Sequence, residues 1–505
     1  MMRVASRRQV DAGADAGAGR AMADGPRKTD ARQVDARASR AGRRAGRQTR
    51  RWTGIGGAAG LGVALVLAVS GCTDGDPLVQ QPGPGVGGTA SVAPSESGVP
   101  TPAATAPATG GAGTGAGAAW GGAGTGAVGA SLTAPFHPAG DPTTVAGELD
   151  APWSIVTLAD GTVLVDERDT GAVKEIRADG SAGAIGTVPG VAAAGEGGLL
   201  GLAAYVDAGG AAGGGTATDT SAGGGAATSG AAGGGTAPTT YLYAYLTTAT
   251  DNRVVRMPLV GSPGSFSLGA VSDVLTGIPK ASNHNGGRIL FGPDGMLYIT
   301  AGDANQSVNA QRVESLSGKI LRVTPAGAVP ADNPFAGSPV YSIGHRNPQG
   351  IAWSSDGTMY AAEFGQNTWD ELNVITPGAN YGWPDVEGLG DGAPGGTLDG
   401  FTNPIVQWTT DEASPSGLTM VGGTLFLAGL GGERLWSITP SGDSPALSST
   451  LVTQYYQGTL GRIRDVVTTA DGTGLLLVTN NTDGRGSPQA GDDRLVRVAL
   501  SPGAS

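Results

Sequence analysis

A short pattern that recurs five times limits the fold of this chain more than any other feature of its sequence. In each copy, a tight Asp-Gly or Gly-Gly turn is followed by an apolar stretch of strand length. Asp-Gly is typical of β-hairpins because its residues tolerate the positive φ angles that such turns need. The copies are LADGTVLVDE (158–167), GPDGMLYITAG (292–302), SSDGTMYAAEFG (354–365), VGGTLFLAGLG (421–431) and TADGTGLLLVT (469–479). The pattern therefore predicts a chain of repeated hairpins.

The spacing of these hairpins indicates how they are assembled. Insertions aside, a unit begins about every 50–65 residues, and three units continue into a second apolar strand with a basic residue, GAVKEI, GKILRV or ERLWSI. Four-stranded units of this kind protect their sheet edges by packing around an axis. With YLYAYLTT…NRVVRM as a further unit, we predict an all-β fold over residues 146–500. It would be a six-bladed β-propeller of four-stranded antiparallel blades, with seven blades or a large β-sandwich as the alternatives.

The N-terminal region predicts export. Residues 1–71 begin with a basic segment and end with an apolar run, Ile55 to Val69, which is followed by small residues and Cys72. An apolar run this short after basic residues is typical of a signal peptide rather than of a membrane span. The stretch VSGC also resembles the lipobox of bacterial lipoproteins. That resemblance implies lipid on Cys72 and an extracytoplasmic protein anchored to the cell membrane; an ordinary cysteine near a signal peptide is the alternative.

Two segments have a composition that cannot bury a core. Residues 72–145 are rich in Gly, Ala, Pro and Thr with little periodicity, and residues 207–240 form a second such run between two strand-like stretches. Chains of this composition remain flexible because they have too few apolar side chains to offset the entropy of ordering. We predict a disordered linker over the first segment and a disordered surface insertion within the fold over the second.

Charge narrows the range of ligands. Residues 1–51 hold 14 basic and 5 acidic residues, whereas the chain from Cys72 onward holds 17 basic and 38 acidic residues, a net charge of −21. Such a body disfavours nucleic acid, because binding phosphates takes basic groups. A neutral substrate or a bound cation suits it better.

Polar residues at loop ends are candidates for a site, because the loops on one face of a propeller converge on its central channel. His284 precedes the strand RILF, and Asp303 ends the strand that would pair with it. A histidine beside a carboxylate can act as a base at neutral pH. A solvated histidine and an aspartate that caps a turn are the alternatives.

Arginines and carboxylates form further clusters. Arg346 and Asn347, in GHRNPQG, offer donors to an anionic or carbonyl-rich ligand. Arg462 and Arg464, in GRIRDV, lie on one side of an extended segment and suggest a carboxylate site. A surface pair and a solvated strand face are the alternatives. The stretch 363–392 is dense in carboxylates and turn carbonyls, which are oxygen ligands of the kind that Ca²⁺ takes.

Several long motifs occur in one order between residues 149 and 498: LDAPWSIVTLADGTVLVDERDTG, GEGGLLGLA, HNGGRILFGPDGMLYITAGDA, GHRNPQGIAW, DELNVITPGANYGWPDVEG and RIRDV. Together they resemble the soluble PQQ-dependent glucose/sorbosone (aldose sugar) dehydrogenases. The resemblance implies a six-bladed propeller, in agreement with the repeats, and PQQ and Ca²⁺ as cofactors. It also implies oxidation of aldose sugars at the anomeric carbon to the lactone, with a respiratory carrier as the electron acceptor.

The same resemblance implies roles for the polar clusters. His284 would be the general base that takes the proton from the anomeric hydroxyl while hydride passes to PQQ, and Asp303 would orient it. Arg346 and Asn347 would contact the quinone oxygens, and Arg346 would also take part in catalysis. The two arginines of RIRDV would bind the carboxylates of the cofactor.

Two calcium sites are implied as well. Main-chain carbonyls of Gly365 and Gln366 would hold the Ca²⁺ that polarises the quinone. A second, structural Ca²⁺ would lie near Glu371, Tyr381 and Asp391.

The chain departs from the family pattern at three places. Glu196 stands in the cofactor region where the family has glutamine, and a carboxylate there would lie close to an anionic cofactor. Gly431 stands where a cofactor-binding basic residue is usual, although Arg434 is a candidate to replace it. Gln366 stands where the best-known members have proline, which leaves the main-chain carbonyl in place.

Three functions follow as hypotheses. The first is an exported, lipid-anchored aldose dehydrogenase that depends on PQQ and Ca²⁺. The second is a propeller lipoprotein that binds a sugar or glycan without turnover, which the changes at Glu196 and Gly431 favour. The third is a Ca²⁺-dependent lactonase on a similar propeller.

Overall fold

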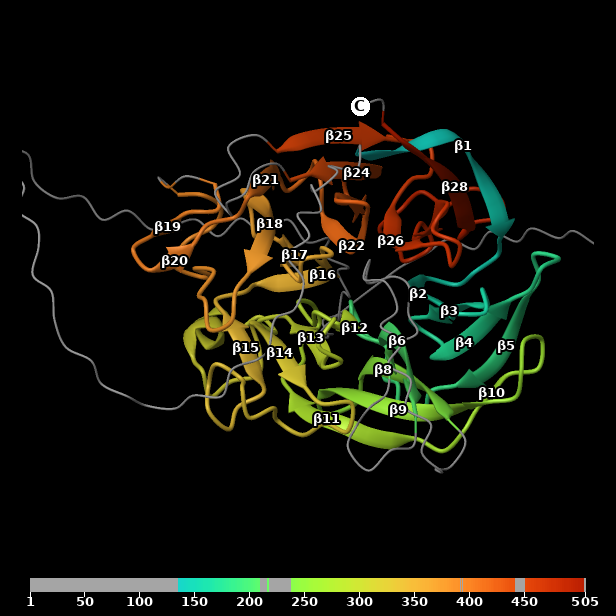
Figure 1. Cartoon of the computed structure of the whole chain (residues 1–505), viewed down its shortest axis with the longest axis horizontal. Helices are drawn as coiled ribbons and strands as arrows, with labels where there is room; N and C mark the ends of the chain where they lie inside the picture. The colour runs from blue at the N-terminus through green and yellow to red at the C-terminus, as the bar shows by residue number, and fades with distance from the viewer. Residues whose placement is uncertain are drawn as a thin grey trace, which may run out of the picture. The chain divides into compact units, whose positions relative to one another are not determined.

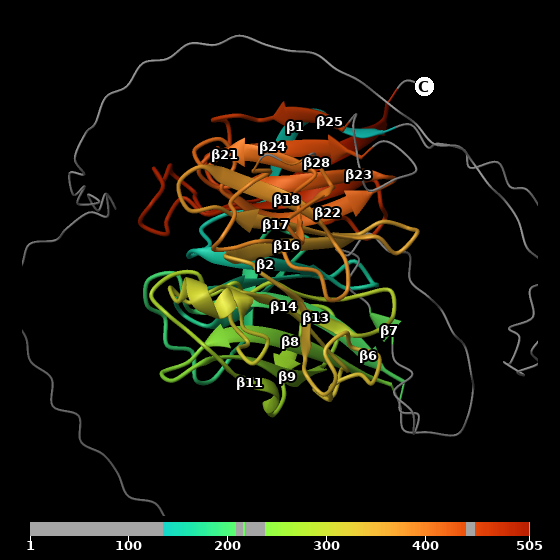
Figure 2. The ribbon, with the colours of Figure 1, turned by 90° about the vertical axis from the view of Figure 1, so that its left-hand side faces the viewer.

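The computed structural model of the chain describes residues 135–208, 216–217, 238–390, 392, 394–440 and 450–503. These residues form six antiparallel sheets arranged around one axis (Figure 1), and Figure 2 shows the same sheets from the side. The helical element among them is one 3₁₀ turn, η2 (Ser307–Gln311), and they include no helix with the length and apolarity to cross a membrane. The prediction of a six-bladed β-propeller with four-stranded antiparallel blades is confirmed.

Each blade runs from an innermost strand at the axis to an outermost strand at the rim. In this order, the first blade is β2 (Pro152–Thr157), β3 (Val163–Glu167), β4 (Ala172–Ile176) and β5 (Ala182–Thr187). The second is β6 (Leu199–Asp207), β8 (Thr239–Thr247), β9 (Asn252–Val260) and β11 (Ser272–Ile278), with the short strands β7 (Thr216–Ala217) and β10 (Ser267–Leu268) added to β6 and β9. The third is β12 (Ile289–Phe291), β13 (Leu297–Ala301), β14 (Lys319–Val323) and β15 (Val340–Ile343).

The fourth blade is β16 (Asn347–Trp353), β17 (Met359–Phe364), β18 (Trp369–Ile375) and β21 (Val406–Thr409), and the hairpin β19 (Thr397–Leu398) and β20 (Phe401–Thr402) lies in the loop before β21. The fifth is β22 (Pro415–Val421), β23 (Thr424–Gly429), β24 (Arg434–Thr439) and β25 (Leu451–Tyr455). The sixth is β26 (Ile463–Thr468), β27 (Gly474–Thr479), β28 (Leu495–Pro502) and β1 (Phe136–Ala146).

The recurring turn joins the first and second strands of five blades. In the four Asp-Gly copies, the glycine N–H donates to the carbonyl three residues earlier at 2.8–3.0 Å, and the glycine has a positive φ, as at Gly295 (φ 73°). In the second blade this position holds the predicted insertion 207–240. Its ends belong to β6 and β8, and most of it lies outside the described residues.

The sixth blade shows where the predicted domain boundary was wrong. Residues 136–146, which we assigned mostly to the linker, form β1 and pair with β28 as the outermost strand. The segment contains Pro138 and Pro142, which an edge strand tolerates because one side of it needs no N–H donors. The ring closes inside as well, since β2 packs beside both β6 and β26. The rest of the predicted linker, the predicted signal peptide and Cys72 lie in residues 1–134, outside the described part.

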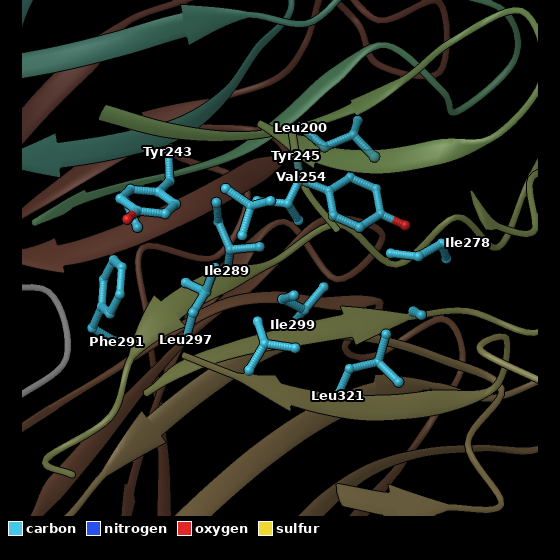
Figure 3. Packing of buried hydrophobic residues seen from close by; sticks show 14 of the residues in the cluster. Leu200, Tyr243, Tyr245, Val254, Ile278, Ile289, Phe291, Leu297, Ile299 and Leu321 are labelled. Atoms are coloured by element: carbon cyan, nitrogen blue, oxygen red, sulfur yellow. The ribbon is translucent and has the colours of Figure 1, made fainter. Parts of the chain in front are cut away.

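The core lies between neighbouring blades. β2, β12, β16 and β26 are buried along their whole length because sheets cover both of their faces. Between the second and third blades, Tyr205 and Tyr243 pack against Phe291 with ring centroids 4.7 and 5.0 Å away, and Leu200 and Ile299 belong to the same cluster of buried side chains (Figure 3). Each such side chain contributes roughly 1.5–3 kcal/mol by burial.

Strand direction decides which residues share a face. Each inner strand runs towards its turn, so its beginning lies on the opposite face of the propeller. Because the second strand is antiparallel, its end lies on that opposite face too. Residues just before an inner strand and just after a second strand therefore gather on one face, the site face.

Candidate active site

His284 and Asp303 form a hydrogen-bonded pair on the site face. His284 precedes β12 and Asp303 follows β13, and the distance from Nδ1 to Oδ1 is 2.8 Å. The histidine side chain is 13% exposed and the aspartate side chain 2%. An ionised carboxylate only accepts hydrogen bonds, so Nδ1 carries the proton in this pair. That leaves Nε2 of the neutral ring as the basic nitrogen.

The surroundings of Asp303 keep it ionised. Burial raises its pKa, but the hydrogen bond from His284 lowers it, and the indole Nε1 of Trp383 donates to Oδ2 at 2.9 Å. The Asn305 N–H adds a bond of 2.8 Å. The pKa of Asp303 therefore lies below its ordinary value. The prediction that these two residues meet is confirmed, and Trp383 is a partner that the sequence analysis missed.

The backbone of His284 is held in an unusual conformation, with φ at 56°. Its N–H donates to Oε2 of Glu196 at 3.0 Å, and its carbonyl accepts from the Ala304 N–H at 3.1 Å. A Cβ on Gly302 would lie 2.2 Å from that carbonyl oxygen, so glycine is required there. The two hydrogen bonds and the close approach of Gly302 hold the backbone of His284 in place.

Arg346 and Asn347 lie beside this pair. The Asn347 Oδ1 accepts from the Gly286 N–H at 3.0 Å, and so the amide holds the histidine loop. Arg346 stacks on Trp383, 5.5 Å from the ring centroid. Burial lowers the pKa of Arg346, although Asp303 and other carboxylates oppose the shift. Its buried Nε has no hydrogen-bond partner in the described structure.

A cavity of about 240 Å³ adjoins these residues. Its walls include Trp153, Glu196, Asn347, Arg462, Arg464 and Arg485. They come from loops before β6 and β26, from the starts of β2, β16 and β26, and from the loop after β27. Residues far apart in sequence are therefore brought together by closure of the ring.

Arg464 is the most buried cation of this cavity. Its Nη1 donates to Gln349 Oε1 at 2.9 Å and to Ser416 Oγ at 3.3 Å, while its Nε lacks a partner among the described residues. Burial, assisted by the like charge of Arg462, lowers its pKa to about 9. Arg462 donates from Nη2 to Asp483 Oδ2 at 3.1 Å. A guanidinium with an unpaired N–H in a cavity is suited to an anionic ligand.

Arg434 does not take the place of the basic residue missing at Gly431. Its Nε donates to the Gly432 carbonyl at 2.7 Å, its Nη1 donates to Gln454 on the outermost strand β25, and it stacks on Trp436. It does not line the cavity described above.

The turn at Gly365 and Gln366 has an unexpected partner. One oxygen of Glu387 accepts four consecutive backbone N–H groups, from residues 366 to 369, at 2.7–3.1 Å. In a trans peptide the C=O points away from the following N–H. The carbonyls of Gly365 and Gln366 therefore point away from Glu387, which leaves them free to face a cation.

Glu371 and Tyr381 line one small cavity of about 10 Å³ together with Glu363 and Glu387. This space is about that of one water or ion. Burial, with the nearby charge of Glu363, raises the pKa of Glu371. The Tyr381 hydroxyl already donates to the Val374 carbonyl at 2.6 Å.

Asp391 lies outside the described residues, and those residues hold no group of three or more His, Cys, Asp or Glu side chains arranged to bind a metal. Of the three residues predicted for the second calcium site, the structure brings Glu371 and Tyr381 together in one small cavity. Calcium binding at this cavity stays a proposal.

The comparisons with known proteins agree with this geometry. The family described as Glucose / Sorbosone dehydrogenase matches residues 149–208 and 236–495. The chain is 29% identical over 284 residues to quinoprotein glucose dehydrogenase B of Acinetobacter calcoaceticus, covering 50% of this chain and 54% of that protein. It is 33% identical over 248 residues to the aldose sugar dehydrogenase YliI of Escherichia coli, covering 44% and 65%. The aligned segments thus span about half to two thirds of these relatives.

One solved structure matches a larger share of the chain than these two relatives do. The PQQ-bound aldose sugar dehydrogenase from Streptomyces coelicolor is 43% identical, with a TM-score of 0.60, and the match covers 72% of this chain and 100% of that one. The fold and site define a six-bladed propeller with a histidine–aspartate pair beside an arginine-lined cavity. The chain belongs to the glucose/sorbosone dehydrogenase family.

Proposed function

We propose that this protein oxidises aldose sugars at the anomeric carbon to the lactone, with PQQ and Ca²⁺ as cofactors. The observation that carries the proposal is the His284–Asp303 pair beside a cavity with an incompletely paired, buried arginine. The names of the relatives, which refer to quinoprotein glucose and aldose sugar dehydrogenases, support it.

The donor set of the cavity fits PQQ, a flat molecule with three acid groups. Arg462 and Arg464 would bind carboxylates, and the unpaired Nε of Arg464 supplies a donor that the described structure leaves unused. Arg346, which lines the neighbouring small cavity, has a second unpaired Nε. Asn347 lines the same cavity. When bound, PQQ would supply the quinone that accepts hydride from the sugar carbon.

The chain's own residues would handle the proton. Asp303 fixes the Nδ1–H tautomer of His284, and Nε2 would take the proton of the anomeric hydroxyl. Trp383 and Asn305 hold Asp303 in place. The family role implied for His284 thus has a matching arrangement here.

Calcium would bind at the carbonyls of Gly365 and Gln366, which the Glu387 contacts turn outwards. A second ion would bind near Glu371 and Tyr381, where a cation would also offset the proximity of Glu363. Oxygen ligands of this kind suit Ca²⁺.

The test is a titration of the purified propeller, residues 135–505, as apoprotein. We expect saturable uptake of PQQ in the presence of Ca²⁺, followed through cofactor absorbance, and aldose-dependent reduction of a redox dye. Uptake of sugar without dye reduction would support a sugar-binding propeller instead. Lactone hydrolysis that needs Ca²⁺ but no PQQ would support the lactonase.

Replacing Asp303 with asparagine should lower kcat about a hundredfold, because the amide can present either its N–H₂ or its oxygen to Nδ1 and no longer fixes the tautomer. PQQ uptake should persist, since the arginines of the cavity are unchanged. Steady-state kinetics and a PQQ titration on the same preparation check this. A variant with unchanged kcat would remove Asp303 from the proton path.

We also propose export and anchoring by lipid at Cys72, on the basis of the basic and apolar N-terminal sequence. The resemblance to the family supports a respiratory electron acceptor. Expression of the full chain and of Cys72→Ser in a bacterium that processes lipoproteins tests this. The unsubstituted chain should fractionate with membranes, and the variant should not.

A further inference from the structure

Arg485 is a cation of the cavity that no motif of the sequence analysis included. It lies in the segment NNTDGRG, in the loop between β27 and β28 on the site face. Its Nη1 is 2.8 Å from Oε1 of Glu196, in the loop before β6. The arginine side chain is 56% exposed and the glutamate side chain 22%. The pair therefore joins two loops that are 289 residues apart.

An ion pair this exposed adds little to stability, since such pairs typically contribute about 0–1 kcal/mol. Its position indicates instead that the pair affects the charge of the cavity. Among the described residues, the cavity is lined by three arginines, Arg462, Arg464 and Arg485, and by one carboxylate, Glu196. At neutral pH this lining has a formal net charge of +2, to which Arg485 contributes as much as each buried arginine.

The other charges nearby make the contribution of Arg485 more important. Arg462 is already paired with Asp483, whose side chain is 1% exposed. Glu196 divides its oxygens between Arg485 and the His284 N–H. The Glu196 carboxylate that would repel an anionic ligand is thus partly neutralised by Arg485, whose side chain is exposed and lines the cavity.

We propose that Arg485 is a further cofactor-binding residue, which attracts the acid groups of PQQ, and that Glu196 weakens this attraction by pairing with it. This inference rests on the proposed function. It gives Glu196 and Arg485 opposite effects on cofactor affinity, although the two residues form one ion pair. If the ion pair only held the two loops together, the loss of either residue would weaken PQQ binding.

The test measures the dissociation constant for PQQ, by absorbance titration at fixed Ca²⁺, in five proteins. They are the unsubstituted propeller, Arg485→Gln, Glu196→Gln, the double variant and Arg434→Gln. The last is the matched control, because it removes the same charge from a residue that contacts Gln454 and does not line the cavity. Glutamine at 196 keeps an acceptor for the His284 N–H.

We expect Arg485→Gln to raise the dissociation constant about tenfold and Glu196→Gln to lower it about threefold, as a single charge at a partly screened distance would do. The double variant should lie between them, and Arg434→Gln should match the unsubstituted protein. The effect of Arg485→Gln should shrink as salt is added.

Two results would overturn the inference. Arg485→Gln could behave as Arg434→Gln does, or Glu196→Gln could weaken binding as much as Arg485→Gln, which would make the pair a clasp between loops. Failure of the proposed function would look different, because the unsubstituted protein itself would then take up no PQQ.

Discussion

Replacing His284 with alanine is expected to lower kcat for aldose oxidation by about 10²–10⁴-fold, the usual contribution of a general base. The variant loses the only group in the Asp303 pair that can accept the hydroxyl proton, since the buried carboxylate is itself held by Trp383 and Asn305. The dissociation constant for PQQ should change little, because the cavity arginines are unaffected.

The fold of the variant should persist, because the contacts to Glu196 and Ala304 use the backbone of residue 284. His137→Ala is the matched control, since that residue lies on the outermost strand β1. Steady-state kinetics with a redox dye and a PQQ titration on each variant make the measurement. Equal kcat for the two variants would contradict the role of His284, and parallel loss of PQQ binding would make it a cofactor ligand instead.

The blades were predictable because their signal is local. An Asp-Gly or Gly-Gly turn and the strand after it fall within about ten residues, and the structure has such a turn between the first and second strands of five blades. The closing strand β1 was not predictable in the same way. Its partner β28 is about 350 or more residues away in sequence, and its prolines resemble the linker composition predicted for the preceding residues.

The same distinction separates the parts of the site. His284, Asp303 and the RIRDV arginines lie within motifs, so their type and their position beside strands indicated a site. Trp383, Arg485 and Glu387 act through contacts with residues 80, 289 and about 20 positions away. The one signal available for them was position, since they follow strands that end on the site face or lie in the long loop between β18 and β21. Only the closed ring shows which partners they meet.

Substitution of Glu387 is expected to affect both stability and Ca²⁺ binding. One of its carboxylate oxygens accepts four backbone N–H groups from residues 366 to 369. Burial raises the pKa of Glu387, but these four bonds outweigh it, so that the pKa lies below its ordinary value. A bond to a charged group contributes about 1.5–3 kcal/mol when shielded from water. Residues 366–368 are exposed, so water can replace part of what is lost.

Glu387→Ala is therefore expected to lower the free energy of unfolding by about 2 kcal/mol. It should also weaken Ca²⁺ binding at least about tenfold, because the carbonyls of Gly365 and Gln366 lose the contacts that orient them. Glu387→Gln keeps one acceptor oxygen, so its stability and Ca²⁺ affinity should lie between those of the unsubstituted protein and Glu387→Ala. Because the folded-state pKa is lowered, the stability from Glu387 is complete above the ordinary value of 4.5 and is lost as pH falls through the folded value.

The measurement is urea unfolding of the apoprotein at pH 7 and near pH 3, together with calorimetric titration of Ca²⁺ at pH 7. The difference in unfolding free energy between the unsubstituted protein and Glu387→Gln should be smaller near pH 3 than at pH 7. Glu412→Gln is the control, since this exposed carboxylate accepts only one backbone N–H among the described residues, from Thr409. If Glu387→Ala lost stability but bound Ca²⁺ as tightly as the control, the turn would be a structural element of the fourth blade. That result would contradict the proposal that Glu387 orients the carbonyls of Gly365 and Gln366 to bind Ca²⁺.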